Sequence, residues 1–169
     1  MAASSVIKNQ FGAGSITIKD GTGSPLTVAA DFDQGDFSVS GLMANLKESA
    51  VYQTRGVVRS VRHTERSFPS ISFTALMSEF SDASGGTMLN MIAGTAPFAA
   101  RVSTLGASAD VITFDVVIVI EGTDLGDSAD ATLTFEDVAL AVDYTGGDPS
   151  QFSVSGTVYG GITGDLTIS

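Results

Sequence analysis

Apolar and polar residues alternate with a period of two over most of the chain, the pattern typical of half-buried β-strands. Five runs carry it most clearly: 15–19, 37–41, 70–75, 111–120 and 152–158. Turn signals separate the runs, among them Asp20-Gly21 and the segment 146–149, which reads Gly-Gly-Asp-Pro. The sequence therefore predicts a mainly β fold.

The run 131–144 changes phase part-way along. Leu133 and Phe135 are apolar at odd positions, whereas the later apolar residues occupy even positions: Val138, Leu140, Val142 and Tyr144. A slip of one residue sends every following side chain to the opposite face of a sheet. The sequence therefore predicts a bulge or tight bend at Glu136-Asp137.

One segment departs from the strand pattern. In 79–93 the apolar residues Met88, Leu89, Met91 and Ile92 recur at helical spacings, and Gly94 follows as a stop. We expect one helix here, with Ser81 or Asp82 as its N-cap and its methionines in the core. The predicted fold is a β-sandwich or barrel-like arrangement of two antiparallel sheets with this one flanking α-helix.

The chain is long enough for a single domain over 1–169, and we expect the terminal segments 1–14 and 160–169 to be arms that order on contact with a neighbour. Its longest aliphatic run, 116–120, is far shorter than the roughly 18 residues of a membrane span. We therefore predict no membrane association.

Charge is distributed unevenly. The net charge is -11, yet all 8 basic residues lie in 1–101, where 8 acidic residues balance them, so the imbalance belongs to 102–169. Five of the basic residues fall within 47–66. Either both segments are ordinary solvated faces, or the cationic segment of one copy meets an acidic patch of the next in a heterologous contact. The candidate interface residues are Lys47, Glu48, Arg55, Arg59, Arg62 and Arg66.

Enzyme motifs are missing from the sequence. It has no Cys, which excludes thiol catalysis, thiolate metal sites and disulfides. Its one histidine, His63, lies among arginines and is interpreted as a surface or interface residue. Neither a Gly-x-Ser-x-Gly elbow nor a phosphate-binding loop is present. We predict no catalytic residues and no cofactor.

Two acidic clusters have a spacing that could suit calcium. They are Asp31, Asp33 and Asp36, and Asp124, Asp127 and Asp130. The first lacks the closing Glu and the following helix of a helix-loop-helix calcium site. We interpret both as turn-forming residues at strand ends and predict no metal site.

The remaining features resemble those of a known family. They are short Ser/Thr-rich strands, an Ile-Thr-Ile-Lys-Asp-Gly-Thr opening (16–22), Gly-Asp-Phe-Ser-Val-Ser-Gly-Leu (35–42), Tyr-x-x-Arg-Gly (52–56) and Ser-Phe-x-x-x-Ser-Phe-Thr (67–74). Over 15–160 this layout resembles the major tail tube proteins of long-tailed bacteriophages. The resemblance implies a structural virion protein made in the host cytoplasm. Six copies would form each ring, and stacked rings would form the tube for genome delivery.

The resemblance also implies partners and surfaces. A loop after an early strand would reach the neighbouring ring, and 42–55 is the candidate for it. Tape-measure and tail-end proteins would bind the tube, and DNA would pass through without specific binding. An anionic lumen suits that passage because it repels phosphate. The candidate lumen residues are Asp115, Glu121, Glu136, Asp137 and Asp143.

Two alternatives remain open at the level of the sequence. A capsid decoration protein, or another virion surface protein, has the same β-rich, acidic and cysteine-free composition. A secreted adhesion or carbohydrate-binding β-sandwich belongs to a different class, and calcium dependence at the aspartate clusters would distinguish it.

Overall fold

A computed structural model describes residues 14–24, 27–32, 37–41, 47–66, 68–76, 87–120, 130–147 and 151–165. Several predictions lie outside these ranges: the lumen candidate Glu121, the helix caps Ser81 and Asp82, the 42–46 part of the predicted loop, and residues 1–13 and 166–169 of the predicted terminal arms.

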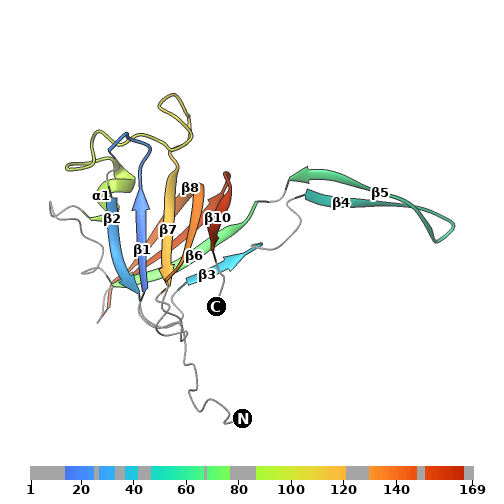
Figure 1. Ribbon diagram of the computed structural model, residues 1–169, viewed down its shortest axis with the longest axis horizontal. Helices are drawn as coiled ribbons and strands as arrows, with labels where there is room; N and C mark the ends of the chain where they lie inside the picture. Colours follow the sequence, from blue (N-terminus) through green and yellow to red (C-terminus); the bar gives the residue numbers. More distant parts are fainter. Residues whose placement is uncertain are drawn as a thin grey trace, which may run out of the picture.

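Eight antiparallel strands form one curled sheet (Figure 1). Its order is β2-β1-β7-β8-β9-β6-β3, and β10 also pairs with β8. The strands are β1 (Gly14–Lys19), β2 (Thr27–Phe32), β3 (Phe37–Ser40), β6 (Ser70–Leu76), β7 (Phe114–Ile120), β8 (Ala131–Thr145), β9 (Gln151–Val158) and β10 (Ile162–Asp165). A second sheet contains only β4 (Lys47–Thr54) and β5 (Val57–Arg66). The prediction of a mainly β fold is confirmed.

The predicted bulge in 131–144 is present. Phe114 of β7 pairs with Val138 and Val116 pairs with Phe135, so Asp115 alone lies opposite Glu136 and Asp137. Asp137 takes up the extra residue with a φ of 54°. The bulge lets both Phe135 and Val138 point into the core.

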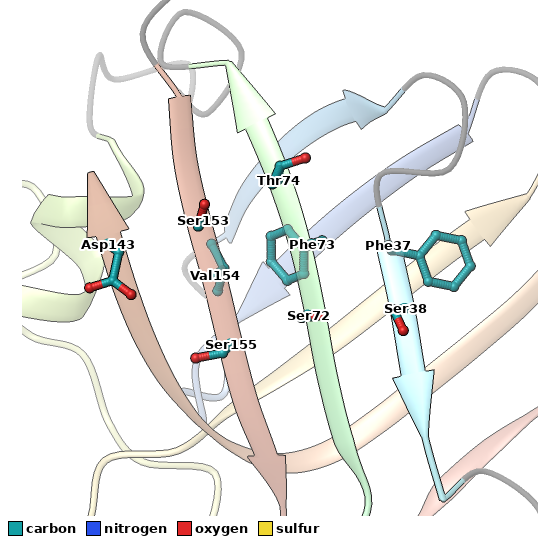
Figure 2. A pocket seen from close by; sticks show the side chains of 9 residues that line it. All are labelled: Phe37, Ser38, Ser72, Phe73, Thr74, Asp143, Ser153, Val154 and Ser155. Carbon is teal, nitrogen blue, oxygen red and sulfur yellow. The ribbon is translucent and has the colours of Figure 1, made fainter. Parts of the chain in front are cut away.

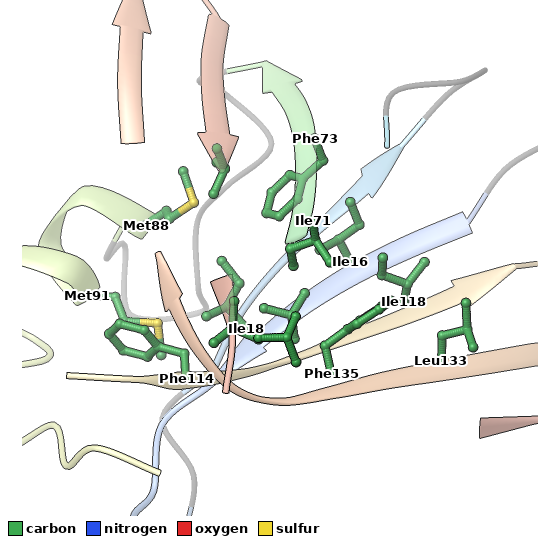
Figure 3. Packing of buried hydrophobic residues seen from close by; sticks show 14 of the residues in the cluster. Ile16, Ile18, Ile71, Phe73, Met88, Met91, Phe114, Ile118, Leu133 and Phe135 are labelled. Carbon is green, nitrogen blue, oxygen red and sulfur yellow. The ribbon is translucent and has the colours of Figure 1, made fainter. Parts of the chain in front are cut away.

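The core fills the inside of the curl. Alternate residues of β1, β7, β8, β6 and β9 point inward, as Ile16, Ile118, Phe135, Phe73 and Phe152 do, and each is at most 2 % exposed. Met88 and Met91 close one end of this core, as expected for the methionine stripe (Figure 3).

The helix is shorter than predicted. It is α1 (Met88–Ala93), and its N-cap is Thr87, whose hydroxyl accepts from the Asn90 amide while the Asn90 side chain accepts from the Thr87 amide. Gly94 ends it in the left-handed conformation, as predicted. Leu89 is 41 % exposed, whereas Met88 and Met91 are buried and Ile92 packs against the core while partly buried.

The residues 111–113 are not part of β7, although they continue its alternation. Thr113 is fully buried, and its hydroxyl lies 2.9 Å from the hydroxyls of both Ser103 and Thr104. These bonds hold the 103–113 segment as an irregular loop. The Asp20 carboxylate anchors its start by accepting from the Val102 amide at 3.1 Å.

The C-terminal segment 160–169 also differs from the prediction that it orders only on contact with a neighbour. Residues 162–165 of the predicted 160–169 arm form β10, which pairs with residues 132–135 of β8 within the same chain. The reason is the bulge, which lets β9 and β10 lie one after the other along the same side of β8.

Candidate functional site

A two-stranded hairpin projects from the curled sheet (Figure 1). It consists of β4 and β5, joined by the two-residue turn Arg55-Gly56, and we call residues 47–66 the arm. Both turn residues have positive φ, 52° and 78°, which is the twist that a tight hairpin needs. Where the sequence predicted a loop over 42–55, the described part is thus a strand and a turn, and the hairpin continues to Arg66.

Large apolar side chains stand exposed on both faces of the arm. Val51 and Val61 form a cross-strand pair and are 51 % and 59 % exposed, and Val58 lies on the same face. Tyr52 and Val57 are exposed on the other face. Because isolated two-stranded hairpins are marginally stable in water, the arm has the features of a segment stabilised by a partner.

The arm also carries most of the chain's positive charge. Five Lys and Arg residues against Glu48 and Glu65 give it a net charge of +3. Arg55 is at the tip, Arg59 is the extra residue where the register shifts, and Arg62 lies over the Tyr52 ring at 5.9 Å. Lys47 and Arg66 are paired in register at the base, with Glu48 next to Lys47 and His63 opposite Ser49. The structure thus brings all six predicted interface residues onto one element.

A second surface consists of small side chains. On the outer face of β3, β6, β9 and the later half of β8, cross-strand rows run through Ser38, Ser72, Ser155 and Ala141, and through Ser40, Ser70, Thr157 and Ala139. A third row joins Thr74, Ser153 and Asp143. A shallow groove of about 320 Å³ crosses this small-residue face (Figure 2). Its hydroxyls and small volume suit close passage or packing of another molecule.

The four strands beneath that face end in two open edges. In the described part of the chain, residues 139–143 of β8 pair only with β9, and residues 38–40 of β3 pair only with β6. All neighbours along the path β8-β9-β6-β3 are antiparallel. With four strands, β3 runs opposite to β8, so β3 of one copy can pair antiparallel with β8 of an identical, equally oriented copy.

The predicted lumen residues do not form one group. Asp115, Glu136 and Asp137 gather at the bulge, where the Asp115 carboxylate accepts from the Asp137 amide at 3.1 Å. Burial raises the pKa of Asp115, and repulsion by Asp137 and Glu136 adds to this, while that hydrogen bond and Lys19 oppose it. Asp143 lies apart from them, exposed on the small-residue face.

Other sequence candidates are not assembled into a site. Within the described residues no three His, Asp or Glu side chains are grouped so as to hold a metal ion. Asp33, Asp36, Asp124 and Asp127 of the two aspartate clusters lie outside those residues. No helix among the described residues is long and apolar enough to cross a membrane.

Comparison with known proteins gives no relative: no protein-family model, curated protein or solved structure matches the chain. The functional assignment therefore rests on the arm, the open edges and the distribution of charge.

Proposed function

We propose that the protein is a structural subunit that assembles into rings, and that stacked rings form a tube of the bacteriophage tail-tube type. The observation that carries this proposal is the pair of open edges on the β8-β9-β6-β3 segment. Pairing the β3 edge of one copy with the β8 edge of the next is a heterologous contact, and such contacts close into rings when the rotation allows. Closure also removes edges that would otherwise template aggregation.

In this arrangement the curled sheet acts as a barrel-like sandwich. Its first layer would be β2-β1-β7 with the early half of β8 and its second the four-stranded segment, while α1 lies at one end of the core. The second layers of neighbouring copies would join into one inner barrel. The small-residue face would line its lumen.

The composition of that face supports a conduit for nucleic acid. Its described outward residues are Ser, Thr, Ala, Gln151 and Asp143, with no Lys or Arg among them. Short neutral or anionic side chains leave a smooth wall that does not bind phosphate. DNA would pass without specific contacts.

The arm supplies the second contact that a stacked assembly needs. The arm projects well beyond the sheet (Figure 1), so its exposed valines and arginines can reach another copy without distorting the ring. Tape-measure and tail-end proteins would bind the finished tube. The subunit itself needs neither catalytic residues nor a cofactor.

Negative-stain electron microscopy combined with light scattering on the purified chain tests the proposal. We expect rings or hollow tubes with a regular axial repeat. A protein that stays monomeric or trimeric at every concentration, and binds empty capsids instead, would refute it in favour of a decoration protein.

A further inference from the structure

The structure also points to where the arm binds. We propose that the arm of one copy docks on an aromatic and acidic patch of a second copy, made of Phe68, Tyr159, Asp115, Glu136 and Asp137. This inference rests on the proposed function, because it takes self-assembly as given and identifies the receiving surface. We call these five residues the patch.

The apolar part of the patch is an exposed aromatic pair. Phe68 is 44 % exposed and Tyr159 is 38 % exposed, and their rings meet edge to face with centroids 5.1 Å apart. The Tyr159 amide donates to the Asp137 carbonyl at 3.1 Å, which fixes the pair beside the bulge. Aromatic residues are enriched at protein interfaces, and a pair of exposed rings is therefore a candidate contact.

The acidic part results from the bulge itself. Because Phe135 and Val138 both point inward, the side chains of Glu136 and Asp137 both emerge on the outer face, next to Asp115. Glycines at 160 and 161 leave room for them: an added Cβ would lie 2.8 Å from an Asp137 carboxylate oxygen and 3.1 Å from one of Glu136. Three carboxylates thus share a small area, and a cationic partner would relieve their repulsion.

The arm is complementary to the patch in apolar surface and in charge. It offers Val51, Val58 and Val61 on one face for the aromatic rings, and Arg55 at the tip and Arg59 at the register shift for the carboxylates. Arg62 lies over the Tyr52 ring on the opposite face of the arm and is not part of this contact. Arg55 occupies a left-handed position that favours Gly or Asn, and it carries a positive charge at the tip of the arm.

The geometry selects a second copy as the donor. The arm extends away from its own sheet, and eight residues of β4 span about 25 Å, so its tip cannot turn back to its own base. Phe68 comes only two residues after Arg66, at the end of the arm. The cationic tip and the patch therefore lie at opposite ends of the arm, which is a head-to-tail arrangement that repeats from copy to copy.

Cross-linking between engineered cysteines tests this docking, because the chain has no cysteine of its own. Gln53→Cys places a thiol on the valine face of the arm and Thr163→Cys places one on β10 beside the patch; both positions are exposed, and neither residue is assigned a contact of its own. The two single variants are mixed, assembled and treated with a short flexible bis-maleimide. We expect loss of both monomer bands into a cross-linked heterodimer, which proves an intermolecular contact.

Two controls make the test specific. Ser108→Cys, exposed on the 103–113 loop and not a member of the patch, should leave the monomer bands when mixed with Gln53→Cys. Adding Glu136→Gln and Asp137→Asn to the Thr163→Cys chain should reduce cross-linking, whereas Asp110→Asn should not. Asn tolerates the left-handed backbone at 137, so this variant keeps the bulge.

The outcomes separate the two proposals. Particles that assemble but cross-link equally well through Ser108→Cys, or are insensitive to the charge-neutralised patch, refute the docking site and leave the proposed function standing. A wild-type chain that stays monomeric in light scattering refutes the proposed function, and absence of a cross-linked heterodimer in the mixed Gln53→Cys and Thr163→Cys chains refutes the docking as well.

Discussion

Replacing the valine pair on the arm should weaken assembly without affecting the fold. Val51 and Val61 lie opposite each other and keep 51 % and 59 % of their surface exposed in the single chain. Fully burying a valine contributes about 1.5–3 kcal/mol, so removing the remaining half from water is worth about 1 kcal/mol per residue. Threonine retains the β-branched shape but would bury a hydroxyl, which forfeits that gain.

The double variant Val51→Thr/Val61→Thr should therefore lose about 2 kcal/mol of association energy, which raises the concentration needed for assembly about 30-fold. Light scattering across a dilution series measures that concentration. Thermal unfolding of the dilute monomer should change by less than about 0.5 kcal/mol. Val111→Thr, at a valine that is 49 % exposed outside the arm, is the matched control. The reasoning is refuted if the double variant assembles at the wild-type concentration or if the control weakens assembly equally.

Three further predictions follow from charge and packing. Arg59→Glu should raise the protein concentration needed for assembly, and the difference from the wild type should shrink at high salt because salt screens charge. The unfolding of the monomer should not change. Assembly of the variant at the wild-type concentration would contradict an electrostatic role for Arg59. Asp115→Asn should stabilise the monomer at neutral pH, and the introduced side-chain carbonyl can still accept the hydrogen bond from the Asp137 amide. Because the pKa of Asp115 is raised in the folded state, the free energy of unfolding of the wild type should rise as the pH falls through that pKa. The variant should lack this contribution when unfolding is measured from pH 7 to pH 3. Gly21→Ala should cost about 1–3 kcal/mol in chemical unfolding, because its Cβ would meet the backbone carbonyl of Ser103, while Gly23→Ala, with open space around it, should cost far less.

Periodicity allowed the sequence to predict the strands and the bulge. The change of phase between Phe135 and Val138 is a direct consequence of which side chains enter the core, so the position of the bulge could be inferred from the order of apolar residues alone. Gly94 could likewise be recognised as the helix stop. Both features depend on neighbours in the chain.

Features that depend on distant residues could not be predicted. The buried network between Ser103 and Thr113 removes 111–113 from β7, although the alternation continues through them. Thr87 and Asn90 cap the helix in a less common form of the capping box, whereas the predicted caps were Ser81 and Asp82. The hairpin turn at Arg55-Gly56 could not be recognised from the sequence, because Arg55 occupies a turn position usually held by Asn or Gly.

The candidate surfaces were predicted in part. Clustering of basic residues in 47–66 identified the arm's charge, but its extended geometry came only with the cross-strand register. The acidic residues were grouped by sequence segment, whereas the fold divides them between the bulge and the small-residue face. The open edges had no signal in the sequence, since strand order is a property of the whole sheet.

Hydrogen exchange on assembled and monomeric protein is the most direct measurement of the central claim. If rings form through the two sheet edges and the arm, amides in 38–40, 139–143 and 50–62 should exchange markedly more slowly in the assembly, while 95–113 should be unaffected. Unchanged exchange at both edges in particles that do assemble would contradict the account.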